Sequence, residues 1–237
     1  MVGLILEQVT REPVSRLIER RIIQPLRLRH TYLPDRSPDI AGYHAHGYTP
    51  PSLTGAGYVD QTLLTPTIAW SAGALISNVD DLRRFYRALL GGQLLRPEQL
   101  AQMKDLVPVS EEDGFGYGLG IFAVDSPCGQ VWGHDGGIPG YATVALGDET
   151  GRRNVEIALP TDADEPIATA FTRLLTIAGC RALGHEPPPA SASSAQTSGS
   201  AQGSASSSGS ALGGAERGAG SDSWSRYWSN RLSQSWR

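Results

Sequence analysis

The sequence predicts an α+β protein in which an antiparallel sheet meander is covered by helices and followed by a disordered C-terminal tail. Amphipathic helical patterns lie on both sides of the centre of the chain. Between them, short apolar segments alternate with turns that contain Gly or Pro, which is typical of consecutive antiparallel strands. From Glu186 onward, Pro, Ser, Ala and Gly dominate. We therefore expect a folded domain over residues 1–184 and a Ser/Ala/Gly-rich tail over residues 185–237.

Composition and charge exclude several classes of function. The 237 residues are 40% hydrophobic and carry a formal net charge of -4 without a long basic run, so we expect no nucleic acid partner. No apolar stretch approaches the roughly 18 residues of a membrane-spanning helix. The first apolar run stops at Glu7 and lacks a basic segment, so it is not a signal peptide. As written, the sequence predicts a cytoplasmic chain.

Four helical patterns precede the strands. Residues 2–10 and 13–24 are expected to form helices, the second ended by Pro25. Farther along, Ser77 is expected to cap a helix that stops at a pair of glycines, because Asp80 follows it at the capping-box position. A shorter helix is expected over residues 97–104.

Residues 31–69 are rich in Pro, Gly, Tyr and Thr and show no sustained period, which is typical of an ordered loop. This loop contains His44 and His46, which lie on one side of an extended segment and could share a zinc ion. No Cys, Asp or third His follows at a ligand spacing, so we expect neither a metal nor another cofactor.

The central part of the chain predicts a meander of strands. The expected strands lie near residues 116–124, 129–135, 140–147 and 153–159. In the last of them, Val155, Ile157 and Leu159 face one side. A final helix over residues 164–183 is expected to cover that side of the sheet, with an apolar stripe made of Ile167, Phe171, Leu174, Leu175 and Ala178.

The tail has too few apolar residues to repay the entropy of ordering, and we expect it to be disordered. Its end differs, because Trp224, Trp228, Leu232 and Trp236 recur every four residues among arginines. This spacing fits either an interfacial or partner-docking helix, or an unstructured end with incidental tryptophans.

The stretch Trp132 to Tyr141 contains a histidine, His134, inside a strand pattern with four glycines. Glycine weakens a strand, so such a run usually marks a place where a ligand or another backbone comes close.

At this point four motifs resemble a known family. The chain is similar to the C-terminal part of the serine beta-lactamase and D-alanyl-D-alanine carboxypeptidase superfamily, in its class C-like branch, over about residues 2–183. The matching motifs occur in the family's order, and they are Arg21-Ile-Ile-Gln-Pro-Leu26, Trp70-Ser-Ala-Gly-Ala-Leu-Ile-Ser77, Gly116-Tyr-Gly-Leu-Gly120 and His134-Asp-Gly-Gly-Ile-Pro-Gly-Tyr141.

The resemblance implies a partial beta-lactamase/transpeptidase-like fold and acyl transfer on a small peptide, ester or beta-lactam. In the family, the serine of Ser-x-x-Lys attacks a carbonyl, the tyrosine of Tyr-x-Asn assists proton transfer, and a Lys/His-x-Gly strand forms the opposite wall. By match, His134 would move protons or bind a substrate carboxylate. Gly136 would admit the substrate, and the Gly137 amide would supply half of the oxyanion hole. Asp135 stands where the family often has Thr, Ser or Gly, and would repel an anionic substrate unless its side chain points away.

Neither Ser-x-x-Lys nor Tyr-x-Asn occurs in the chain. Lys104 is the only lysine and Ala101 stands three residues before it, and no asparagine has a tyrosine two residues before it. Ser71 lies in a sequence that imitates a nucleophile elbow, but the first glycine is missing. We therefore assign no nucleophile and expect the chain as written to be inactive.

Two interpretations remain open. The chain is either the C-terminal part of a serine hydrolase whose nucleophile motifs lie upstream, or a non-catalytic remnant that at most binds a ligand or a partner. Intact relatives are often exported to the cell envelope, and some of them bridge the two places at which Cys128 and Cys180 stand here. The resemblance thus implies a disulfide, and two unrelated buried thiols are the alternative.

Overall fold

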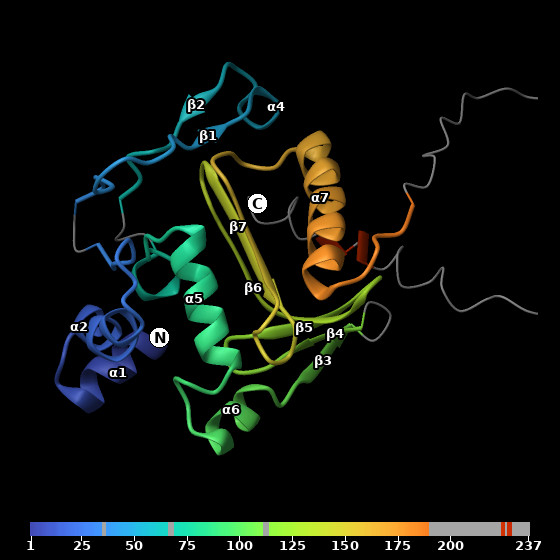
Figure 1. Ribbon diagram of the computed structural model, residues 1–237. Coiled ribbons are helices and arrows are strands. Elements are labelled where there is room, and N and C mark those ends of the chain that lie inside the picture. Colours follow the sequence, from blue (N-terminus) through green and yellow to red (C-terminus); the bar gives the residue numbers. More distant parts are fainter. Residues whose placement is uncertain (35–36, 66–68, 111–113, 190–223, 226, 229–237) are drawn as a thin grey trace, which may run out of the picture.

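The computed structural model describes residues 1–34, 37–65, 69–110, 114–189, 224–225 and 227–228. Its centre is a six-stranded antiparallel sheet in which each strand pairs with its neighbour in sequence. The strands are β3 (Val107–Ser110), β4 (Phe115–Tyr117), β5 (Phe122–Ser126), β6 (Gly129–Ile138), β7 (Tyr141–Gly147) and β8 (Asn154–Leu159). Helix α5 (Val79–Leu90) lies on one face and α7 (Glu165–Leu183) on the other (Figure 1). The expected α+β fold, a meander covered by helices, is confirmed.

The sequence-based strand boundaries need two corrections. The segment expected as one strand over 116–124 is the hairpin β4–β5, because Gly120 adopts a left-handed φ of 74° that turns the chain. Strand β3, which pairs with β4, was not expected. Its Val-Pro-Val-Ser sequence is short and contains a proline, which is tolerated on an edge strand.

The N-terminal region is helical as expected, with a different end. Helix α1 (Val2–Thr10) is followed by α2 (Val14–Ile18), a π-helical turn η1 (Glu19–Ile23) and α3 (Gln24–Leu26). Pro25 therefore lies inside the last helical turn instead of ending the helix. The chain leaves the helix at Arg27, which is left-handed with a φ of 52°.

The region expected as a loop contains short regular elements. Strands β1 (Tyr48–Thr49) and β2 (Val59–Asp60) pair antiparallel, with helix α4 (Pro51–Thr54) between them. Two-residue strands leave no periodic trace in a sequence, which is why this small sheet was not predicted. A 3₁₀ turn, η3 (Trp70–Ala72), precedes α5.

Helix α5 begins one residue later than predicted. Its N-cap is Asn78, whose side-chain oxygen accepts a hydrogen bond of 2.9 Å from the backbone N–H of Asp81. Ser77 instead shares a hydrogen bond of 2.8 Å with Thr31, so its hydroxyl is used to hold the N-terminal region. Helix α6 (Pro97–Met103) matches the expectation to within one residue.

The apolar residues of the sheet divide between its two faces because side chains alternate along each strand. Phe122 and Val124 face the core under α7, whereas Ala123 between them faces the core under α5. The stripe expected on α7 is partly right, since Phe171 and Leu175 are buried while Leu174 is 48% exposed.

A disulfide joins Cys128 to Cys180, with 5.3 Å between their Cα atoms. It ties the turn before β6 to the last part of α7, as the resemblance implied.

Two of the C-terminal tryptophans lie among the described residues, and both pack against the domain. Trp224 and Trp228 are buried in the core under α7, 2% and 0% exposed. These two residues of the C-terminal segment therefore contact the folded domain. The expected disorder of residues 190–223, and the positions of Leu232 and Trp236, lie outside the described residues. Within the described ranges, no helix combines the length and apolarity that crossing a membrane requires.

Candidate functional site

His134 is the first residue of β6 beyond the segment that pairs with β5. Strand β5 pairs with β6 as far as Gly133, which stands opposite Phe122. From His134 to Ile138, β7 is the strand that pairs with β6 in the described part of the chain. His134 therefore lies on a part of β6 that is paired with β7 on one side. On the other side, the pairing with β5 has ended.

The imidazole of His134 is fixed by hydrogen bonds at both ring nitrogens. Nδ1 lies 2.5 Å from the backbone oxygen of Asp135, and Nε2 lies 2.5 Å from the hydroxyl of Tyr117 on β4. A carbonyl oxygen can only accept, so in the neutral imidazole Nδ1 carries the proton and Tyr117 donates to Nε2. The ring also packs against Phe122, at 5.6 Å between centroids. The His134 side chain is 32% exposed, which leaves it accessible.

Asp135 follows His134 but turns away from solvent. Its side chain is 7% exposed, and its Oδ1 lies 3.8 Å from His134 Nδ1. This orientation is the exception that the sequence analysis allowed, in which the carboxylate does not face an incoming anion. The Asp135 carboxylate therefore lies on the Nδ1 side of the imidazole.

The glycines around His134 serve different purposes. A Cβ atom on Gly133 would lie 1.9 Å from the backbone oxygen of Ala145, so only glycine fits between β6 and β7 there. A Cβ on Gly136 would meet only the Thr143 hydroxyl, at 2.9 Å. Gly137 stands opposite Ala142 in the ladder.

The turn after this stretch is held by a residue that the sequence analysis missed. Asp162, 2% exposed, accepts a hydrogen bond of 2.8 Å from the backbone N–H of Gly140 and another from the Thr49 hydroxyl. Tyr141 donates from its hydroxyl to the oxygen of Ala45 at 2.8 Å. The β6–β7 hairpin is thereby anchored to the β1 segment. No local pattern marks Asp162, because its partners lie far away in the sequence.

A second titratable group lies in the same cross-strand row as His134. Ala145 of β7 stands opposite both His134 of β6 and Glu156 of β8. Burial raises the pKa of Glu156 to about 7, with the Asp80 carboxylate adding to the rise and Arg83 opposing it. Burial, reinforced by the charge of Asp135, also raises the pKa of Tyr86 on α5, so this phenol stays protonated.

The other residues considered for chemistry are occupied elsewhere. The ammonium group of Lys104 contacts residues other than His134. Its Nζ donates to the backbone oxygen of Glu149 at 2.6 Å and lies 5.3 Å from the ring centre of Trp132. Ser71 lies in η3, where its hydroxyl approaches Gly3 of α1. The structure brings neither of them to His134 through a described contact.

The loop histidines form a surface pair instead of a metal centre. The rings of His44 and His46 stack at 5.8 Å, and His46 Nδ1 lies 2.8 Å from Asp60 Oδ2. Among the described residues, no three His, Cys, Asp or Glu side chains are grouped so that they could hold a metal ion.

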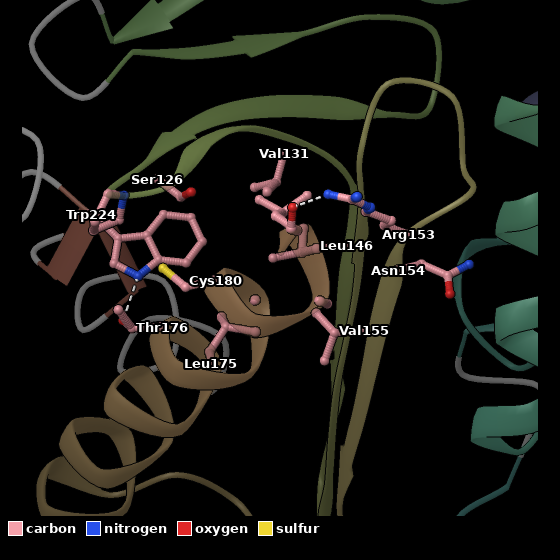
Figure 2. A pocket seen from close by; sticks show the side chains of 15 residues that line it. Ser126, Val131, Leu146, Arg153, Asn154, Val155, Leu175, Thr176, Cys180 and Trp224 are labelled. Atoms are coloured by element: carbon pink, nitrogen blue, oxygen red, sulfur yellow. Dashed lines mark hydrogen bonds between the residues drawn. The ribbon is translucent and has the colours of Figure 1, made fainter. Parts of the chain in front are cut away.

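Two hollows in the described part of the chain lie away from His134. A cavity of about 10 Å³ between α7 and the sheet is lined by Cys180 and Trp224 among others (Figure 2). A hollow of about 230 Å³ lies along α1 and α2 and is lined by Leu6, Val14 and Leu17 among others. We place the candidate site at the accessible surface around His134 on β6, which neither of these hollows includes.

Comparison with known proteins decides the family. The model of the beta-lactamase family matches residues 1–175, about three quarters of the chain. The chain belongs to the beta-lactamase family. The family is the one that the four motifs implied, and its members similar to this chain include amidases.

Three solved relatives illustrate the match. A D-stereospecific amidohydrolase from a Streptomyces species is 39% identical with a TM-score of 0.64, over 68% of this chain and 47% of that one. The D-amino acid amidase of Ochrobactrum anthropi SV3, complexed with D-phenylalanine, is 25% identical with a TM-score of 0.57, over 67% and 48%. A penicillin-binding protein from Bacillus halodurans shares the fold at 18% identity and a TM-score of 0.60, over 73% and 52%. The chain thus spans about half the length of these relatives.

Tyr117 is a hydrogen-bond partner of His134 that sequence reasoning did not identify. It was noted only as part of the motif Gly116 to Gly120, without a role. Its contact with His134 depends on the β4–β5 hairpin, which brings residues 17 positions apart within hydrogen-bonding distance. A tyrosine flanked by glycines near a strand end was the available signal.

Proposed function

We propose that this chain forms one wall of an acyl-transfer site that hydrolyses amides of D-amino acids. The observation that carries the proposal is the hydrogen-bonded pair of His134 and Tyr117 on the β6 strand of a beta-lactamase-family fold. The substrate class is suggested by the 39% identical relative, which is a D-stereospecific amidohydrolase. D-alanyl peptides, beta-lactams and esters are the neighbouring substrates of the family.

In this proposal His134 and Tyr117 act together as the general acid–base pair. The proton between them can reside on the Tyr117 oxygen or on His134 Nε2, and a general acid–base group must change between two such states. The hydrogen bond from Nδ1 to the oxygen of Asp135 orients the ring for this exchange. Gly136 and Gly137 leave room for the substrate, and the Gly137 amide stabilises the oxyanion.

The proposed reaction also needs a nucleophile that this chain lacks. A serine hydroxyl attacks only with an activating base within hydrogen-bond reach, and the single lysine, Lys104, bonds to Glu149 instead. We therefore propose that the chain alone forms no acyl-enzyme. A polypeptide segment that carries Ser-x-x-Lys and Tyr-x-Asn has to face His134 for the reaction to proceed.

Labelling with a fluorescent penicillin tests both parts of the proposal. The purified chain is incubated with the probe alone, and again with the part of the Streptomyces amidohydrolase that this chain does not cover. We expect a denaturation-stable labelled band only in the mixture, together with ammonia release from D-phenylalanine amide. His134→Ala should slow labelling by about 100-fold, since proton transfer by a positioned group contributes 10²–10⁴-fold. His44→Ala, on the remote loop, is the matched control and should have no effect.

Two outcomes would contradict the proposal. A band from the chain alone that disappears in Ser71→Ala would identify that serine as a nucleophile. A mixture that forms a stable complex by size-exclusion chromatography, but neither labels nor releases ammonia, would favour the non-catalytic remnant.

A further inference from the structure

The C-terminal end of the described chain packs back onto the core beside the candidate site. We call Trp224, Tyr227 and Trp228 the aromatic segment; its described residues have helical backbone. Trp224 donates from Nε1 to the hydroxyl of Thr176 on α7 at 2.8 Å, next to Cys180 (Figure 2). Because the disulfide fixes α7 to the turn before β6, this bond gives the segment a rigid attachment.

The other end of the segment contacts the rings that support His134. Tyr227 packs on Phe115 of β4 at 4.8 Å between centroids and on Phe122 of β5 at 6.2 Å. Trp228 packs on Phe122 at 6.3 Å. Phe122 in turn packs against His134 at 5.6 Å. A continuous row of rings therefore joins the segment to the imidazole.

Phe122 is the central ring of this row. It is 0% exposed, so its position depends on the rings around it, and a gap on the segment side would let it move away from His134. Phe115 has a parallel effect, because it packs at 6.5 Å on Tyr117, the hydrogen-bond partner of His134. Loss of the segment would thus loosen both supports of the imidazole at once.

We propose that the aromatic segment is a positioning element of the candidate site, in which Tyr227 and Trp228 hold Phe122 against His134. Ring packing carries this role for Trp228, since its Nε1 has no hydrogen-bond partner in the described part of the chain. The functional meaning of the role rests on the proposed function of His134. The role itself concerns the geometry of the imidazole and can be measured without any acyl transfer.

The test compares variants of the full, oxidised chain by the rate at which diethyl pyrocarbonate modifies each histidine. Mass spectrometry of peptides reports His134 and, as an internal reference on the remote loop, His44. In the native chain, the bond to Tyr117 and the contact with Phe122 protect His134 Nε2. We expect Tyr227→Ala and Trp228→Ala to raise the His134/His44 rate ratio severalfold.

Leu175→Ala is the matched control for a general loss of stability. Leu175 is a fully buried member of the same core and lines the cavity beside Cys180, so its truncation also removes core packing. We expect it to leave the His134/His44 ratio unchanged. A further reference, Tyr117→Phe, removes the hydrogen bond itself and should raise the ratio.

Leucine variants keep the test decisive if an alanine variant does not fold. Tyr227→Leu and Trp228→Leu retain apolar volume but lose the ring, and folded samples are selected by circular dichroism. A raised ratio in these variants supports the positioning role. The proposal is overturned if the ratio stays at the native value in the folded variants, or if Leu175→Ala raises it equally. Neither result depends on labelling by penicillin, so the failure of this proposal is distinct from failure of the proposed function.

Discussion

At the scale of single residues, Glu156 makes stability depend on pH. Its pKa is about 7 in the folded chain against 4.5 for an ordinary glutamate, and its Oε1 has no hydrogen-bond partner among the described residues. Because folding raises this pKa, the folded state is favoured as long as the carboxyl is protonated. The contribution of Glu156 to the free energy of unfolding is therefore fully present below pH 4.5 and is lost as the pH rises through 7. We expect Glu156→Gln to remove this loss, so that the variant melts a few degrees higher than the native chain at pH 8 but not at pH 4.5. Thermal unfolding across this pH range is the measurement, and Glu149→Gln, at an exposed position, should retain the native pH profile.

Gly133 illustrates a residue whose identity is fixed by backbone contact. Gly133→Ala would drive its Cβ into the oxygen of Ala145, 1.9 Å away, and should lower the free energy of unfolding by about 3 kcal/mol or more. Gly136→Ala is the matched control on the same strand, since its Cβ meets only a hydroxyl that can rotate away. We expect it to change stability by less than about 1 kcal/mol. Equal urea-denaturation midpoints for the two variants would show that the backbones of Gly133 and Ala145 leave room for a Cβ atom.

At the scale of elements, the disulfide couples the β5–β6 turn to α7. Its two cysteines are 52 residues apart, and closing a loop of that size stabilises the fold by about 4 kcal/mol in the chain-entropy model. The double variant Cys128→Ala/Cys180→Ala should lose stability by this amount in urea denaturation. The native chain treated with dithiothreitol should match it. A reduced chain as stable as the oxidised one would mean that α7 is held by packing alone.

For the whole molecule, association is expected to depend on the exposed apolar face of α1. Val2, Leu4, Ile5 and Val9 are 71%, 60%, 55% and 77% exposed and lie on one short helix. Such a contiguous patch favours association, so we expect the chain to form oligomers at micromolar concentration. The double variant Ile5→Lys/Val9→Lys should sediment as a monomer in analytical ultracentrifugation. Leu174→Lys, which charges an exposed apolar residue of α7, is the control and should leave the association unchanged.

Elements with a local residue pattern could be predicted from the amino-acid sequence. Alternation located β6, β7 and β8, and the 3.6-residue period located α5 and α7, because the apolar residues of each element recur within a few positions. The ordered motifs also placed His134 on a strand beside glycines. Hydrophobic periodicity could not separate β4 from β5, since the decisive event there is the left-handed turn at Gly120.

Contacts between residues far apart in the chain become apparent only once the protein is folded. The bond between Tyr117 and His134 requires the sheet register, and the anchoring of Gly140 requires Asp162 to return from beyond β8. The four-residue spacing of the C-terminal tryptophans did not reveal that Trp228 packs against Phe122, more than 100 residues earlier in the chain. In each case the partners are separated by many residues, and the contact forms because the sheet and α7 have already created the surface that the second partner covers.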